Sequence, residues 1–177
     1  SSHAVTNESP VHITLVPGIA RGEKMDWILQ KATELGVQRI VPVITDRTEV
    51  KLDEDRADKR ILHWQRVLES ACEQCGRAQV PQVESPLTLE RAARLLAEES
   101  DSKLVLHPEG GKPLSQISVG DAATIAIGPE GGFSDRDLAV LDQAGFQRIT
   151  LGPRVLRTET AGLAAIAALQ TRFGDFG

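Results

Sequence analysis

The stretch AIGPEGGFSDRD, residues 126–137, joins an apolar run to the first turn of a helix through three closely spaced glycines. Ser134 and Asp137 have the Ser-x-x-acid spacing of a capping box, which predicts a helix that begins near Asp135. A strand, a tight loop and a helix in this order indicate one unit of an α/β fold. Glycines at this density indicate that some group approaches the loop backbone closely.

Two further runs repeat this pattern, because KLVLH (103–107), ATIAIG (123–128) and RITLG (148–152) are all short, apolar and followed by loops with Gly or Pro. Continuous apolar runs are typical of strands that are covered on both faces. Elsewhere, apolar residues recur at helical spacing, for example in GEKMDWILQKATELG (22–36) and in residues 56–75, so helices are expected there. The sequence therefore predicts a parallel α/β sheet whose three loops share one edge, where ligands of such sheets bind.

The identity of that ligand stays open at this level. GPEGG lacks the lysine of a phosphate-binding P-loop and the spacing of a dinucleotide-binding GxGxxG motif, so phosphate, NAD and ATP are weakly supported guests. A tight strand-to-helix turn explains Gly131 and Gly132 without any ligand. The third loop, GPRVLR (152–157), presents two arginines and an apolar pair, and loops on a rigid scaffold are where function concentrates.

Composition restricts the class of protein. A chain of 177 residues with 41% hydrophobic and 25% charged residues fits one globular domain. We expect a cytoplasmic protein with no membrane segment, because no apolar run approaches about 20 residues and no signal pattern opens the chain. The net charge of −5 argues against a generally basic nucleic-acid-binding surface, although residues 146–173 carry four arginines against one glutamate.

The two cysteines, Cys72 and Cys75, lie three apart near the end of a predicted helix. No second Cys or His pair stands at ligand spacing, so we expect no metal site. A redox CxxC motif would open a helix, where the thiolate is stabilised. The favoured interpretation is two small, partly buried helix residues.

Two segments resemble the signature of the RsmE family of ribosomal RNA methyltransferases: IGPEGGFS (127–134) and LGPRVLRTETA (151–161). KMDWILQKATELGV (24–37), TDRTEV (45–50) and ESACEQCGR (69–77) are similar to further family motifs in the same order. The family modifies N3 of a uridine in 16S RNA of the small ribosomal subunit. Its SPOUT fold implies an α/β domain with a parallel sheet flanked by helices and a C-terminal deep trefoil knot, a threading that general topology rules disfavour.

The resemblance implies S-adenosylmethionine as cofactor, bound in a bent conformation by three knot loops, 106–109, 127–132 and 151–156, with 157–161 closing the site. Leu151, Val155 and Leu156 suit an apolar slot for adenine, and the glycines let backbone approach the ribose and methionine parts. The expected cofactor-binding residues are Leu106, His107, Pro108, Ile127, Gly128, Pro129, Glu130, Gly131, Gly132, Leu151, Gly152, Val155, Leu156, Thr160 and Ala161.

The implied reaction is a displacement in which uracil N3 attacks the sulfonium methyl group. We expect an arginine to stabilise the uracil oxyanion as the N3 proton leaves, with Arg157 and Arg77 as first choices. Arg47 and Arg154 are expected to contact the RNA. Proton removal falls to Glu73, to Glu159 or to water, since arginine is a poor base. For each arginine the alternative is a structural salt bridge or a helix cap.

The polar stretch SSHAVTNESP, residues 1–10, predicts a disordered leader or a remnant of expression, and residues 11–177 are expected to form the SPOUT methyltransferase domain. The family normally carries an N-terminal PUA-like RNA-binding domain, so we expect a truncated form with a weakened hold on ribosomal RNA. SPOUT enzymes are typically dimers, and the Ala-rich C-terminal helix is a plausible interface for a homodimer. The competing hypothesis is a non-catalytic RNA-binding or ribosome-assembly module that keeps the knotted fold and needs no cofactor.

Overall fold

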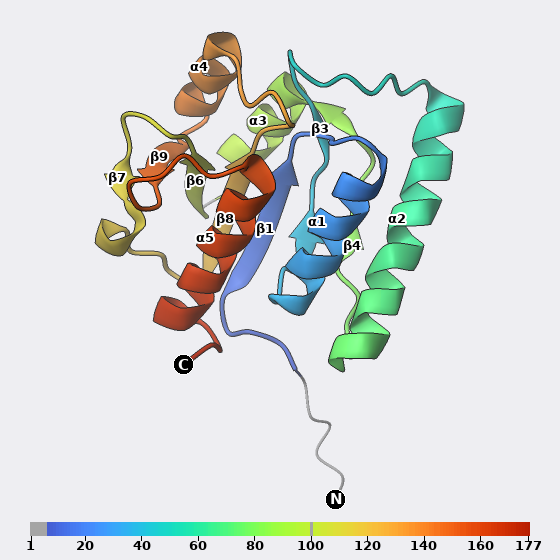
Figure 1. The fold of residues 1–177 in the computed structure, drawn as a ribbon, viewed down its shortest axis with the longest axis horizontal. Helices are drawn as coiled ribbons and strands as arrows, with labels where there is room; N and C mark the ends of the chain where they lie inside the picture. Colours follow the sequence, from blue (N-terminus) through green and yellow to red (C-terminus); the bar gives the residue numbers. More distant parts are fainter. Residues whose placement is uncertain (1–6, 100) are drawn as a thin grey trace, which may run out of the picture.

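The computed structural model describes residues 7–99 and 101–177. Within these residues, seven parallel strands form one sheet in the order β4-β2-β1-β8-β6-β9-β7 (Figure 1). The strands are β1 (His12–Pro17), β2 (Arg39–Ile40), β4 (Gln82–Val83), β6 (Ser102–Leu106), β7 (Lys112–Pro113), β8 (Ala122–Ile127) and β9 (Gln147–Thr150). A separate parallel pair joins β3 (Val43–Ile44) to β5 (Leu87–Thr88). The predicted parallel α/β sheet is confirmed.

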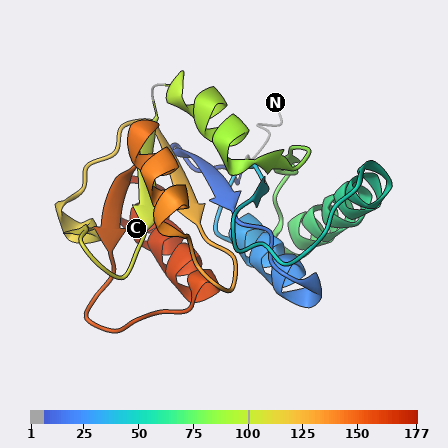
Figure 2. The same cartoon turned by 90° about the horizontal axis from the view of Figure 1, so that it is seen from above.

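Helices cover both faces of the sheet. One core cluster gathers residues of α1 (Gly22–Glu34), α2 (Glu54–Cys75) and α5 (Thr158–Phe173) with the strands. A second cluster gathers α3 (Leu89–Ala97) and α4 (Asp135–Gln143) on the other face. Figure 2 shows α3 on the opposite side of the strands from α1 and α5. A short 3-10 helix (Leu114–Gln116) completes the elements.

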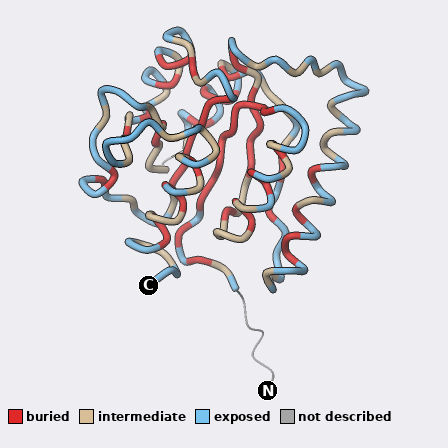
Figure 3. Tube along the Cα trace, viewed as in Figure 1, coloured by how far each residue is buried: buried red, intermediate tan, exposed pale blue. Residues whose placement is uncertain are grey.

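The central strands are buried because both of their faces carry apolar side chains. In β1, Ile13 and Leu15 belong to the first cluster, whereas Val16 belongs to the second. In β8, Ile125 belongs to the first cluster and Ala126 to the second. The continuous red track through the middle of Figure 3 is this pair of strands. Alternating side chains of a strand point to opposite faces, so a continuous apolar run fills both cores at once.

Strand β9 is threaded between two strands that are adjacent in sequence. Ile149 pairs with Leu106 of β6 on one side and with Lys112 of β7 on the other. The connection 107–111 therefore crosses β9, and it does so closely: a Cβ on Gly111 would lie 2.9 Å from backbone atoms of Arg148 and Ile149. The chain after β9 then returns to pack α5 against β8 and α1. This threading is the arrangement that the knotted fold implied.

The segment before β1 corrects one expectation. Residues 1–6 lie outside the described residues, but residues 7–10 do not behave as a disordered leader. Ser9 is buried, and its hydroxyl donates to the Gln170 side chain in α5 at 2.6 Å. Glu8 forms an ion pair with Arg77 at 2.7 Å. Local polarity predicted disorder, whereas partners distant in sequence give these polar side chains a fixed place.

None of the described helices combines the length and the apolarity needed to span a bilayer.

Candidate cofactor site

A cavity of about 270 Å³ lies where the loops after β6, β8 and β9 meet, at the carboxyl ends of these strands. Most of the residues expected to bind cofactor line it. These are Leu106, His107, Pro108, Gly128, Gly131, Gly132, Leu151, Gly152, Val155, Leu156 and Ala161. Its wall also includes Pro153 and Thr158, which lie within the expected segments 151–156 and 157–161. Three further lining residues flank the expected segments and were not predicted: Phe133, Ile149 and Thr150. Strand ends that are distant in sequence thus form one concave surface.

Four residues expected to bind cofactor lie off the cavity wall. The side chain of Ile127 packs against Gly162 in α5, and Pro129 packs against Gly18. The carboxylate of Glu130 accepts a hydrogen bond from the backbone N–H of Arg21 at 2.7 Å, directly before α1. Thr160 is exposed in the first turn of α5. Ile127, Pro129 and Glu130 therefore hold the loop against its neighbours, which are Gly162 of α5, Gly18 and the backbone directly before α1.

The glycines of the GPEGG loop serve two different purposes. A Cβ on Gly128 would lie 2.8 Å from the backbone of Gly132, so the close approach there is the loop against itself. Gly132 and Gly152 have φ values of +74° and +66°, a region that side chains disfavour. The close contact at Gly128 is therefore within the loop itself, while Gly128, Gly131, Gly132 and Gly152 all line the cavity, and ligand approach to them stays a prediction.

The turn at residues 45–48 fixes the outside of the GPEGG loop. Arg47, which also lines the cavity, donates from Nη1 to the carbonyl oxygen of Gly131 at 2.8 Å. The neighbouring Asp46 accepts a hydrogen bond from the Ser134 hydroxyl at 2.7 Å. Ser134 also caps α4, and both hydrogen bonds of the predicted capping box with Asp137 are present. Two consecutive side chains thereby hold the loop and the helix that follows it.

Of the two arginines after β9, Arg154 lines the cavity and Arg157 does not. Arg154 is exposed. Arg157 is the exposed N-cap residue of α5, between the lining residues Leu156 and Thr158. Within the described residues, neither side chain makes an ion pair or a hydrogen bond. Both guanidinium groups are therefore available to a ligand.

Glu159, which follows in α5, lies 3.7 Å from the ammonium group of Lys24 and is largely buried.

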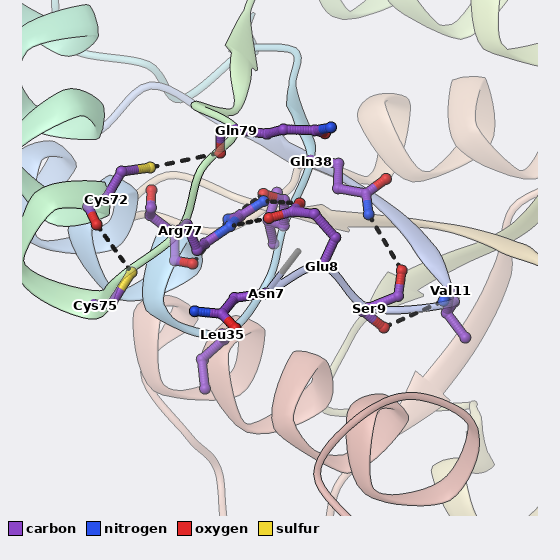
Figure 4. Close-up of polar contacts among 12 residues, drawn as sticks. Asn7, Glu8, Ser9, Val11, Leu35, Gln38, Cys72, Cys75, Arg77 and Gln79 are labelled. Carbon is purple, nitrogen blue, oxygen red and sulfur yellow. Dashed lines mark hydrogen bonds and ion pairs between the residues drawn. The ribbon is translucent and has the colours of Figure 1, made fainter. Parts of the chain in front are cut away.

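Arg77 and Glu73 are placed far from this cavity, at the opposite end of the sheet. The Arg77 side chain is only 5% exposed, and its Nε and Nη2 donate to the Glu8 carboxylate at 3.0 and 2.7 Å (Figure 4). Its Nη1 donates to the backbone carbonyls of Thr33 and Val37. Glu73 is exposed near the C-terminal end of α2. The expectation of a catalytic role is corrected for both, because Arg77 cross-links α1, α2 and the segment before β1.

The cysteines of the same region are structural, as expected. Cys72 is buried and Cys75 partly buried in the last turn of α2, and both are free thiols. The Cys72 thiol donates to the backbone carbonyl of Gln79, and burial raises its pKa. A raised pKa keeps the thiol protonated and poorly nucleophilic. Across residues 7–99 and 101–177, no cluster of three or more side chains could hold a metal ion.

Comparison with known proteins identifies the family of this chain. The RNA methyltransferase domain family matches residues 7–170. The chain belongs to this family. The match includes Glu8 and Ser9, which agrees with their packed positions in the fold.

Curated relatives within the family share one enzyme name. The chain is 36% identical over 176 residues to ribosomal RNA small subunit methyltransferase E of Buchnera aphidicola, covering 96% of this chain and 67% of that protein. It is 32% identical to the enzyme of the same name from Bacillus subtilis, covering 93% and 68%. The chain thus spans about two thirds of the length of these relatives.

Solved structures agree with this assignment. Ribosomal RNA small subunit methyltransferase E from Neisseria gonorrhoeae, bound to S-adenosyl methionine, has a TM-score of 0.93 and 44% identity, covering 99% of this chain and 72% of that chain. A putative methyltransferase from Legionella pneumophila, in complex with the same cofactor, has a TM-score of 0.91 and 41% identity, covering 97% and 71%. The SpoU methyltransferase AviRb from Streptomyces viridochromogenes is 15% identical with a TM-score of 0.56, a likeness of fold alone.

Proposed function

We propose that this chain transfers a methyl group from S-adenosylmethionine to N3 of a uridine in 16S ribosomal RNA of the small subunit, in the cytoplasm. The observation that carries the proposal is the cavity at the carboxyl ends of the threaded strands. The segments that build it, GPEGG and LGPRVLR, are the ones that resemble the RsmE signature. Its relatives in the family carry the name of a ribosomal RNA methyltransferase.

The cavity suits S-adenosylmethionine in its chemistry. Leu106, Leu151 and Leu156 provide an apolar wall for an adenine ring, and the glycine-rich loops expose backbone groups that can read its edge. His107 has a fixed orientation, because its Nδ1 accepts a hydrogen bond from the backbone N–H of Glu109 at 3.2 Å. When bound, the cofactor would supply an activated methyl group on a sulfonium ion.

The chain's own task is to position uracil and to stabilise the charge that develops on it. N3 of neutral uracil is a poor nucleophile, and loss of its proton places negative charge on the neighbouring oxygens. We assign stabilisation of that charge to Arg157, which is exposed and unpaired within the described structure and stands in sequence between the lining residues Leu156 and Thr158. A donor already aimed at the developing charge is worth roughly 100- to 1,000-fold in rate. Arg154, on the cavity wall, is assigned to the RNA.

We further infer a homodimer. Val155 is 83% exposed beside the cavity, and Trp27 on α1 is 44% exposed. Helix α5, which packs beside α1, carries Ala164, Ala167 and Thr171 outside its buried face. Equilibrium sedimentation at micromolar concentration tests this inference, and a purely monomeric protein would exclude it.

Mass spectrometry of small-subunit RNA tests the proposed reaction. The RNA is incubated with the chain and S-adenosylmethionine, digested to nucleosides and compared with RNA from the same incubation without protein. We expect 3-methyluridine to form only with protein and cofactor together. Binding of RNA without methylation and without any binding of the cofactor would instead support a non-catalytic RNA-binding module.

A further inference from the structure

A second cavity, of about 420 Å³, lies between the segment 50–52 and the first turns of α2. Its wall is basic and contains no carboxylate. The lining residues are Val50, Lys51, Leu52, Arg56, Lys59, Arg60 and His63. We call these residues the α2 groove. A groove of this charge stands out in a chain whose net charge is −5.

Helix α2 separates its charges by face. Arg56, Lys59, His63 and Arg66 follow each other at spacings of three and four residues, so they share one face of the helix. Trp64 and Leu68 occupy the buried face. The acidic residues Asp55, Asp58, Glu69 and Glu73 recur on a third face. The two charged faces adjoin, since Asp55 precedes Lys59 by four residues and Glu69 follows Arg66 by three, but neither pair is within ion-pair distance in the described structure.

Few acidic groups from the surrounding elements compensate the groove. Arg56 lies 3.7 Å from Asp53, and His63 lies 2.7 Å from Asp26 of α1. Glu49, just before the groove, pairs with Arg21. Within residues 7–99 and 101–177, Lys51, Lys59 and Arg60 have no carboxylate within ion-pair distance. These three cations are therefore available to an anionic ligand.

The groove is connected to the cofactor cavity by a short stretch of chain. Arg47 lines that cavity, and four residues later Lys51 lines the groove, so their Cα atoms are at most about 14 Å apart. Figure 1 places the start of α2 and the segment leading to it at the same end of the molecule as the carboxyl ends of β1 and β8. Arg154 and Arg157 lie at this end too. Positive groups thus lie both at the cavity and at the start of α2, and Glu49 between them is paired with Arg21.

We propose that the α2 groove binds the phosphodiester backbone of the RNA substrate, within a few nucleotides of the base that enters the cavity. The inference rests on the proposed function and adds to it a second contact surface for RNA within this domain. Lysine and arginine bind phosphates without reading sequence, and they fix the register of the strand. Leu52 and Val50 form the floor, so the contacts to RNA come from the cationic side chains around them.

Fluorescence polarisation of a short fluorescein-labelled single-stranded RNA tests the groove, without cofactor and over a series of KCl concentrations. The test variant is K51E/K59E, in which both altered residues are exposed. The matched control is R91E/R94E, which makes the same change in charge on α3, on the other face of the sheet. K51Q/K59Q serves if the reversed charges disturb folding.

We expect K51E/K59E to weaken RNA binding about tenfold at low salt and to reduce the slope of log K against log [KCl] by about 0.7 for each phosphate that the variant no longer neutralises. The control should change affinity less than about threefold through net charge alone. Equal losses in both variants, or no loss in K51E/K59E, would overturn the proposal, as would a wild-type chain that binds no RNA. Calorimetry with S-adenosylmethionine separates the two claims, because the groove variant should keep wild-type cofactor affinity whether or not RNA is methylated.

Discussion

At the carboxyl ends of the strands, Arg47 and Arg154 are exposed on the wall of a cavity and Arg157 is exposed at the start of α5, whereas at the other end of the sheet Arg77 is 5% exposed. The buried arginine uses Nε, Nη1 and Nη2 in four hydrogen bonds to partners 40 to 69 residues away in sequence. Arg154 and Arg157 make none within the described part of the chain. One residue type therefore closes the fold at one end of the sheet and leaves charge available at the other.

The two ends of the sheet also differ in how their connecting segments are held. Around the cavity, Gly128, Gly132 and Gly152 shape the backbone, and the loop is held from outside by Arg47 and Glu130. At the opposite end, two sets of polar contacts hold the segment before β1: Ser9 bonds Gln170 of α5, which also donates to the carbonyl of Leu35 after α1, and Glu8 pairs with Arg77 after α2. A rigid base with a shaped, partly open top is a common arrangement for binding sites on α/β sheets.

Arg77→Met should give the largest effect of any single change. It removes one partner of a buried ion pair and leaves Glu8 as an uncompensated charge, so we expect a loss of about 3 kcal/mol in the free energy of unfolding. Urea unfolding measures this loss, while the affinity for S-adenosylmethionine should change less than about threefold because the cavity is remote. A matched control is Arg148→Ala, which breaks an exposed ion pair with Asp142 and should cost less than about 1 kcal/mol.

An Arg77→Met variant that is as stable as the wild type but inactive would show that Arg77 acts in the reaction and not in the fold.

Arg157→Ala should lower activity and leave stability unchanged. We expect turnover in the RNA methylation assay to fall about 100-fold, since one charged donor at the developing oxyanion is removed. Stability and cofactor affinity should stay close to wild type. Arg157→Lys keeps the charge but not the planar fork, so it should restore part of the activity. Unaltered turnover in Arg157→Ala would remove its catalytic role.

Gly128→Ala tests the shape of the middle loop. The added Cβ would lie 2.8 Å from the backbone of Gly132, so the loop must shift and cofactor affinity should fall about tenfold. Gly120→Ala is the control, because a Cβ there meets open space. Calorimetry compares the two variants, and equal affinities would show that the loop shape does not govern binding.

Glu130→Ala should have the smallest effect. Its carboxylate caps the backbone N–H of Arg21 in an exposed position, so thermal unfolding should show a loss of about 1 kcal/mol or less. Cofactor affinity should be unchanged within about threefold, since the side chain lies off the cavity wall. A large loss of affinity would return Glu130 to the binding site.

Local sequence patterns predict the scaffold well, because they carry the information that local structure needs. The apolar runs before Gly128 and Gly152 identify two strands, and parallel strands place their following loops at one edge. The capping box of Ser134 and Asp137 is present as predicted. The three loops that form the cavity could therefore be chosen from the sequence.

Long-range partners explain what the patterns missed. The roles of Arg77 and Glu8 depend on a contact across 69 residues, and neither residue carries a local signal of it. The two residues of β7 are too few to show a period, so the threading of β9 beside it is invisible in the hydrophobic pattern. The contact of Arg47 with Gly131 likewise joins residues 84 apart.

The central claim is that the threaded strand ends bind S-adenosylmethionine, and isothermal titration calorimetry of that cofactor into the wild-type chain and Arg77→Met tests it most directly. We expect one molecule bound per chain with similar affinity in both proteins, at a temperature where the variant is folded. Absence of heat and of any thermal shift in the wild type would contradict the claim. If the wild type binds the cofactor and folded Arg77→Met does not, the site would lie at the Arg77 end of the sheet and not at the carboxyl ends of the strands.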